Sequence, residues 1–338
     1  MPRHLVCLVA LALVTAGSVP AKAQRPNPTV GSIERLDPRL DALVPLDATI
    51  EVLAMGFLWS EGPVWVATDR GGLPAGCLLF SDLPRNRVNR WQPGKGLDVF
   101  LEPAGFTGPA GYGREPGSNG LAIDHEGRLL LCEHGDRRLS RLEPGGGKRT
   151  LADSYQGKRL NSPNDLVVHS SGAIYFTDPP YGLPKNWDDP LRELDVCGVY
   201  RLAPDGGLKL VCGTMTRPNG IGLSPDEQTL YVAQSDSAAP LWRAFAVQAD
   251  GSLDEGRIFF DAKTLPPGRP GLPDGLAVDP AGNLFATGPG GVLVFAPDGT
   301  HLGTLLTGRP TANCTFGEDG RTLFITADSL LCRVRLAK

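Results

Sequence analysis

One internal repeat constrains what this chain can fold into. Six units begin with a carboxamide or carboxylate residue, continue with alternating apolar and small residues, turn, and end in a second apolar run. Each unit therefore predicts an antiparallel hairpin. The units begin at Glu61 (EGPVWVATD), Asn119 (NGLAIDHEG), Asn164 (NDLVVHSSG), Asn219 (NGIGLSPDE), Asp274 (DGLAVDPAG) and Asn313 (NCTFGEDGR).

The spacing of the units predicts the architecture. Successive units begin 39 to 58 positions apart, and further strand-like segments such as 198–212 and 291–306 lie between them. Two strands from the unit and two from the intervening segment make one propeller blade. Since no segment keeps a 3.6-residue apolar period over three turns, helix should be scarce. We predict an all-β chain forming a single six-bladed β-propeller over residues 45–338, with 48–54 as a candidate strand pairing with the last blade.

The N-terminal residues have the pattern of a targeting segment. Basic residues precede an apolar run over 5–16, and Ala21-Lys22-Ala23 has the form of a cleavage site, so 1–23 is predicted to be a signal peptide cleaved after Ala23. A short membrane anchor is the alternative, but the run is shorter than the ~20 residues that cross a bilayer. We expect a periplasmic or secreted protein without membrane insertion. Residues 24–44 are Pro-rich and charged and are expected to form an extended lead-in.

Charge and composition limit the partners. The formal net charge is −4 and basic residues form no long run, which argues against nucleic acid and anionic membranes as partners. A small-molecule substrate is expected, with the protein a monomer or a weak oligomer.

The cysteines leave two possibilities open. Six lie after the signal segment, and none has metal-site spacing: Cys77, Cys132, Cys197, Cys212, Cys314 and Cys332. Cys197 and Cys212 flank a hairpin-like segment and could form a disulfide, which an oxidising compartment permits. Buried free thiols in strands are the alternative.

The first residues of the six units are the candidate site. In a propeller the innermost strands line the central channel, so these residues should form a ring around the axis. The ring holds two carboxylates and four carboxamides. Asn and Asp also favour turns that enter strands, but this explains one or two positions and not Glu61. Oxygen donors suit a hard divalent cation, Ca²⁺ above all, with Mg²⁺, Mn²⁺ or carboxylate-bound Zn²⁺ as alternatives.

Several motifs resemble one family. SEGPVW (60–65), LADSYQGKRLNSPNDLV (151–167), YFTDPPYGL (175–183), RPNGIGLSPDEQTLYVA (217–233) and PDGLAVD (273–279) are similar to the SMP-30/gluconolactonase/LRE family, most of all to its secreted bacterial gluconolactonases. The resemblance implies a six-bladed propeller with a divalent cation on the axis. It implies four ligands, Glu61, Asn164, Asn219 and Asp274, of which Asn164 could instead contact substrate. Asp274, or a water beside the cation, would be the base.

The predicted function follows from the resemblance and the chemistry together. We expect hydrolysis of a sugar lactone, D-glucono-1,5-lactone to gluconate above all, since a divalent cation can polarise the carbonyl and activate water. No G-x-S-x-G motif is present to suggest a serine nucleophile. Another lactone or a phosphotriester is an alternative substrate, and a binding propeller with a structural cation is an alternative function.

Further residues are predicted around the ring. Asn119 and Asn313 should complete the polar floor and bind substrate hydroxyls. His134 (CEHGD) could contact substrate or shuttle a proton, or be a structural histidine at a strand end. Tyr181 (DPPYGL) could form a wall of the pocket or simply pack. Asp165, next to Asn164, is interpreted as structural.

Overall fold

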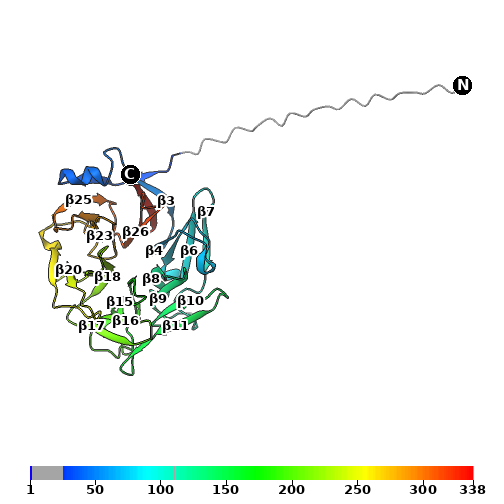
Figure 1. Ribbon diagram of the computed structural model, residues 1–338, viewed down its shortest axis with the longest axis vertical. Coiled ribbons are helices and arrows are strands. Elements are labelled where there is room, and N and C mark those ends of the chain that lie inside the picture. Colours follow the sequence, from blue (N-terminus) through cyan, green and yellow to red (C-terminus); the bar gives the residue numbers. More distant parts are fainter. Residues whose placement is uncertain (2–25, 110, 338) are drawn as a thin grey trace.

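The predicted fold is confirmed. The computed structural model describes residue 1, residues 26–109 and residues 111–337. Six sheets of four or five antiparallel strands stand around a common centre, with β4, β8, β18 and β26 among the strands nearest to it (Figure 1). Residues 2–23 of the predicted signal peptide lie outside the described residues.

Blades 1 to 4 are four-stranded sheets, each built from consecutive strands. Blade 1 contains β4 (Ser60–Val66), β5 (Cys77–Asp82), β6 (Arg87–Gln92) and β7 (Gly96–Leu101). Blade 2 contains β8 (Ser118–Ile123), β9 (Leu129–Glu133), β10 (Arg138–Leu142) and β11 (Lys148–Ala152). Blade 3 contains β14 (Leu166–Val168), β15 (Ile174–Asp178), β16 (Gly198–Leu202) and β17 (Leu208–Cys212). Blade 4 contains β18 (Pro218–Leu223), β19 (Thr229–Gln234), β20 (Leu241–Ala246) and β21 (Arg257–Asp261).

The N-terminal residues complete blades 5 and 6. Blade 5 contains β22 (Leu276–Val278), β23 (Leu284–Gly288), β24 (Gly291–Phe295), β25 (His301–Leu306) and β2 (Ser32–Arg35). Blade 6 contains β26 (Asn313–Gly317), β27 (Thr322–Ala327), β28 (Leu330–Arg335), β3 (Ile50–Met55) and β1 (Thr29–Val30). The pairing of residues 48–54 with the last blade is confirmed, because β3 runs antiparallel to β28.

Helix is scarce, as expected. Besides the strands of the six blades, the described residues contain short 3₁₀ turns and one small extra hairpin. None of their helices is long and apolar enough to cross a membrane. The 3₁₀ turns are η1 (Pro38–Ala42), η2 (Arg70–Gly72), η3 (Leu83–Arg85), η4 (Pro180–Gly182), η5 (Asn186–Asp188) and η6 (Ala262–Thr264). The hairpin is β12 (Ser154–Tyr155) with β13 (Lys158–Arg159).

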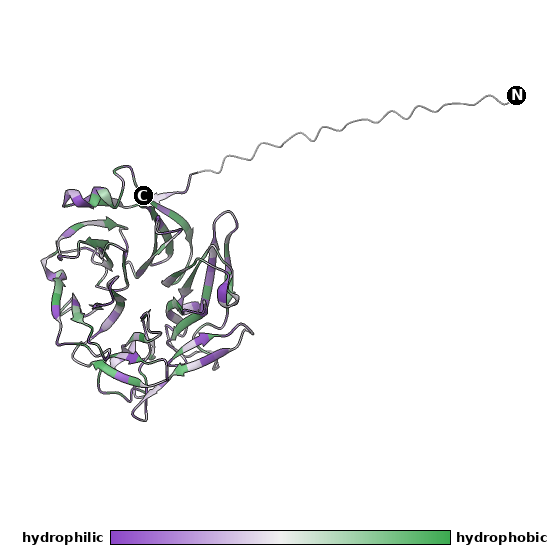
Figure 2. Cartoon of the chain, viewed as in Figure 1, coloured by the Kyte–Doolittle hydropathy of each residue, from purple (hydrophilic) through white to green (hydrophobic). Residues whose placement is uncertain are grey.

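The core lies between adjacent blades. The second strand of each blade is covered on both faces, so its residues form a continuous apolar run rather than an alternating one. All residues of β9, β15, β23 and β27 are buried. Between blades 4 and 5, Trp242 lies 5.7 Å from Phe295, measured between ring centroids. Figure 2 shows the long hydrophobic stretches running along the strands.

The cysteines of the described residues are free thiols, so the possible bridge between Cys197 and Cys212 is not formed. Five of the six are buried, and Cys212 is half-buried. The alternative of buried thiols in strands holds for Cys77, Cys132, Cys314 and Cys332, whereas Cys197 is buried just before β16.

Candidate functional site

Five of the six predicted ring residues line one cavity. Glu61, Asn119, Asn164, Asn219 and Asp274 surround a space of about 390 Å³. They belong to five successive blades, since each one is the second residue of the innermost strand of its sheet or lies two positions before that strand. The other residues around the cavity are Trp59, Leu83, Glu115, Tyr181, Arg217, Ser235, Gly271, Leu272, Pro310 and Thr311.

Buried hydroxyls hold the backbone of this ring in place. Ser81 Oγ donates to the Asn119 carbonyl at 2.8 Å, and Thr177 Oγ1 donates to the Asn219 carbonyl at 2.7 Å. Each bond runs from the second strand of one blade to the first residue of the next unit. Sequence reasoning missed these hydroxyls, although FSD and FTD at the ends of β5 and β15 repeat visibly. The bonds satisfy carbonyls that would otherwise be buried without a partner.

Steric contact between blades explains why glycine follows most of the ring residues. A Cβ added to Gly120 would lie 2.5 Å from Asp165 Oδ1, and one added to Gly220 would lie 2.2 Å from the Asp274 carbonyl oxygen. Both distances are far below van der Waals contact. The repeated Asn-Gly and Asp-Gly pairs therefore reflect close approach of neighbouring blades, and not only turn preference.

Two carboxylates of the ring repel each other. Glu61 is 3% exposed and its Oε2 accepts a hydrogen bond from the Gly62 backbone N–H at 3.0 Å. Burial, and then the charges of Asp165 and Glu115, raise the pKa of Glu61. Burial, and then the charge of Glu61, raise the pKa of Asp274 well above its usual range. The protein alone thus disfavours two negative charges in this cavity, and a bound cation would reverse that preference.

The amide groups of the ring fit a hard cation. Asn164 Oδ1 is buried and has no hydrogen-bond partner within the described structure. Asn219 donates from Nδ2 to Ser235 Oγ at 2.9 Å, which fixes its amide and leaves the oxygen as the free acceptor. No group of three His, Cys, Asp or Glu suited to a metal occurs in the described part of the chain, so a cation here would also need amide oxygens. Two carboxylates with two amide oxygens suit Ca²⁺ or a similar ion.

Asn313 does not line this cavity. Its Oδ1 accepts from the Cys314 backbone N–H at 2.8 Å, and its Nδ2 lies 3.4 Å from Asp165 Oδ2. Both side chains face a second space of about 260 Å³, lined mainly by apolar residues of the innermost strands. Asp165 also accepts from the Leu166 backbone N–H at 2.9 Å. Asn313 and Asp165 thus lie together in the central channel, beyond the ring and outside the cavity.

His134 and Tyr181 occupy different positions relative to the cavity. His134 is fully buried and is not among the lining residues; burial lowers its pKa to about 3, so its imidazole is neutral. Its Nδ1 lies 3.8 Å from Glu115 Oε2. Tyr181 does line the cavity and packs edge-on against Trp187, with ring centroids 5.1 Å apart. Burial, and then the charge of Asp274, raise the pKa of Tyr181.

Sequence reasoning missed several lining residues. Trp59 and Arg217 each precede a ring residue by two positions, so the period of a strand could have indicated that they face the same way. Glu115 lies in the loop between β7 and β8, outside the repeat, and no sequence signal marks it. Burial raises the pKa of Glu115 as well.

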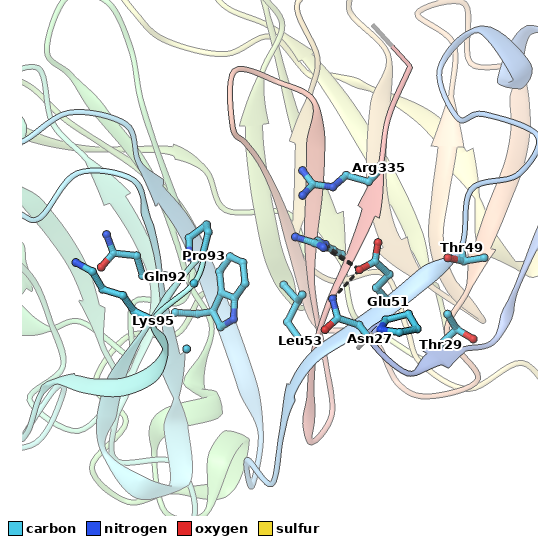
Figure 3. A pocket seen from close by; sticks show the side chains of 14 residues that line it. Asn27, Thr29, Thr49, Glu51, Leu53, Gln92, Pro93, Lys95 and Arg335 are labelled. Carbon is cyan, nitrogen blue, oxygen red and sulfur yellow. Dashed lines mark hydrogen bonds and ion pairs between the residues drawn. The ribbon is translucent and has the colours of Figure 1, made fainter. Parts of the chain in front are cut away.

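A larger groove lies away from the ring. It encloses about 870 Å³ between the N-terminal strands of blade 6 and the turn joining β6 to β7. Figure 3 shows Gln92, Pro93 and Lys95 on one side and Asn27 and Glu51 on the other. Glu51 already pairs with Arg333 at 2.8 Å and accepts from Asn27 at 2.7 Å. The negative charge of Glu51 in this groove is thus already neutralised by Arg333, unlike the charges of the ring carboxylates.

Comparison with known proteins agrees with this geometry. Residues 59–329 match the SMP-30/Gluconolactonase/LRE-like region. The chain belongs to this family. It is 42% identical to a gluconolactonase from Zymomonas mobilis over 98% of this chain and 93% of that one. A solved gluconolactonase structure from Xanthomonas campestris superposes with a TM-score of 0.78 at 37% identity, covering 93% of this chain and 98% of the other. A pentonolactonase from Haloferax volcanii is 26% identical over 79% of this chain and 80% of that one.

Proposed function

We propose that this protein is a metal-dependent lactonase that hydrolyses D-glucono-1,5-lactone to gluconate. The observation that carries the proposal is the oxygen donor set, in which the Glu61 and Asp274 carboxylates share a cavity with the unpartnered Asn164 Oδ1. The identity with the Zymomonas mobilis gluconolactonase over nearly the full length supports the same reaction class.

The residues around the cavity could support each requirement of lactone hydrolysis. A divalent cation bound by Glu61, Asn164, Asn219 and Asp274 would supply a Lewis acid for the lactone carbonyl and lower the pKa of water. Asp274 is half-buried and lies in the same cavity as Glu61, where its carboxylate is placed to accept a proton from the attacking water. Asn119, also in the cavity, can donate to or accept from a substrate hydroxyl.

The identity of the cation is part of the proposal. Ca²⁺ is the first choice, because carboxylate and amide oxygens are its usual ligands and the described residues around the cavity include neither His nor Cys. Mg²⁺, Mn²⁺ and Zn²⁺ are the ions to compare with it.

A pH-indicator assay tests the reaction and the metal together. Protein stripped with a chelator should lose turnover of glucono-1,5-lactone above the spontaneous rate, and one of the four cations should restore it. Asp274→Ala should abolish the restored activity while circular dichroism shows a folded propeller. Asp205→Ala, at an exposed turn, is the matched control and should remain active. Full activity of Asp274→Ala would refute the assignment.

Another sugar lactone is the second candidate substrate, because the relatives include a pentonolactonase. Substrate profiling with five- and six-carbon aldonolactones separates the two. A protein that is stabilised by a cation yet turns over no lactone or ester would instead be a binding propeller.

We also propose that the protein is exported and functions as a monomer or a weak oligomer. The basis for export is the pattern of residues 1–23. N-terminal sequencing of protein from the periplasm or the medium should begin at Gln24, and light scattering on a sizing column measures the oligomeric state.

A further inference from the structure

A second repeated position contributes side chains to the same cavity. Alternate residues of an extended strand face the same side, so the residues two positions before the six unit starts form what we call the upper ring. Its members are Trp59, Gly117, Ser162, Arg217, Leu272 and Thr311. Four of them line the same cavity as the first ring, namely Trp59, Arg217, Leu272 and Thr311.

The other two members have clear reasons for not facing the cavity. A Cβ added to Gly117 would lie 2.6 Å from the Leu83 carbonyl oxygen, so no side chain fits there. Ser162 is fully buried, and its hydroxyl donates to the Pro179 carbonyl at 2.6 Å and accepts from the Gly182 N–H at 2.9 Å. The upper ring therefore presents four side chains to a ligand.

The two rings differ in chemical character. Every residue of the first ring is an acid or its amide, whereas the four side chains of the upper ring are an indole, a guanidinium, an alkyl group and a hydroxyl. A uniform set of donors suits one fixed partner such as a cation. A mixed set suits recognition of a particular organic molecule, because few precisely placed polar groups among apolar ones confer specificity.

Arg217 is the distinctive member of the upper ring. Among the described residues around the cavity it alone carries a positive charge. Its Cζ lies 4.4 Å from the ring centroid of Trp187, and Trp187 in turn packs against Tyr181. Cation–π stacking fixes the plane of the guanidinium. No described residue forms a side-chain hydrogen bond or ion pair with this group, so its N–H donors are available to a ligand.

We propose that Arg217 is the specificity-determining residue that selects polyhydroxylated lactones, an inference that rests on the proposed lactonase function. A guanidinium offers only donors and the Glu115 carboxylate offers only acceptors, whereas each sugar hydroxyl can do both. Leu83, Leu272 and Pro310 provide apolar surface for the C–H faces of the ring. A lactone without hydroxyls would gain nothing from Arg217.

The test compares two six-membered lactones, glucono-1,5-lactone and δ-valerolactone, which has the same ring without hydroxyls. Arg217→Met keeps much of the side-chain length and removes the donors. It should lower kcat/KM for glucono-1,5-lactone by about 10- to 100-fold, the loss of charged hydrogen bonds, and leave δ-valerolactone within about twofold. Arg217→Lys should recover part of the loss, because lysine restores charge but not the planar donor array. The control is Arg257→Met, since Arg257 also stacks on an aromatic ring, Phe259, but outside the cavity.

Two further measurements keep the outcomes distinct. The cation-induced rise in Tm should be the same in Arg217→Met as in the unaltered protein, showing that the first ring is intact. Inhibition by 1,5-anhydro-D-glucitol, which has the hydroxyls but no carbonyl, should weaken by a similar factor in the variant. Equal losses on both lactones, or no loss on glucono-1,5-lactone together with unchanged inhibition, would overturn the inference. Unaltered protein that hydrolyses neither lactone would mean that the proposed function itself has failed.

Discussion

Replacing Thr177 with valine should weaken the junction between blades 3 and 4. Thr177 lies in β15 and is fully buried. Its Oγ1 donates to the Asn219 carbonyl at 2.7 Å and accepts from the Asp165 backbone N–H at 3.2 Å. Valine has nearly the same shape but no hydroxyl, so both backbone groups would stay buried without a partner. At about 1 to 3 kcal/mol for each of the two unsatisfied groups, we expect a loss of roughly 2 to 6 kcal/mol in the free energy of unfolding.

Urea unfolding of the chelated protein measures this loss, with Thr177→Ser as the matched control. Serine keeps the hydroxyl and loses only a methyl group, which costs about 1 kcal/mol. Comparable m-values would show that the variants unfold from similarly compact states. If Thr177→Val were no less stable than Thr177→Ser, the hydroxyl bonds between blades would not have the importance argued for them.

Three other changes test the site. Asn164→Leu removes the unpartnered buried oxygen, so in calorimetry without cation the variant should be as stable as the unaltered protein or about 1 kcal/mol more stable. The rise in Tm that the cation induces should be lost. A cation-free variant that is less stable would contradict this. The pKa values of Glu61 and Asp274 are raised, so the folded chelated protein holds protons that the unfolded chain releases. Its free energy of unfolding should therefore fall as the pH rises from the ordinary Glu pKa of 4.5 to the raised Glu61 pKa of about 8. Glu61→Gln should reduce this fall, and an equal slope in both proteins would argue against it. Gly120→Ala places a methyl group 2.5 Å from a carboxylate oxygen of the next blade and should cost about 1 to 3 kcal/mol in urea unfolding, whereas Gly147→Ala, in open space, should be nearly neutral; similar stabilities would contradict the steric explanation.

The repeat was enough to predict the blades and most of the ring. A fixed period places equivalent residues at equivalent heights, so Glu61, Asn119, Asn164, Asn219 and Asp274 could be grouped from their positions in the repeat. The closing strand could also be anticipated, because 48–54 is strand-like and the last blade needed a partner.

Other features depend on contacts that a period does not encode. The side chain of Asn313 lies over Gly275, where a Cβ would come within 2.0 Å of Asn313 Cγ, and reaches toward Asp165 instead of the cavity. The Asn313 side chain takes this direction because Gly275 of the neighbouring blade leaves the space open. Glu115 reaches the cavity from a loop, and loops carry no periodic signal. The short strands β1 and β2 extend two blades from the segment expected to be a lead-in.

The way the ring closes has a consequence for biosynthesis. Strand β3 near the start of the chain pairs with β28 at its end, and Arg333 Nη2 lies 2.8 Å from Glu51 Oε2 although the two residues are 282 positions apart in the sequence. Blade 6 therefore cannot be completed until β28 has been synthesised, and contacts so distant in sequence form slowly. Until then the edges of β3 and β27, which β28 joins, are open to pairing with other chains. A nascent chain that lacks β28 should thus need chaperone protection, while in the finished ring the pairing of β3 with β28 leaves no blade that can unfold independently of its neighbours.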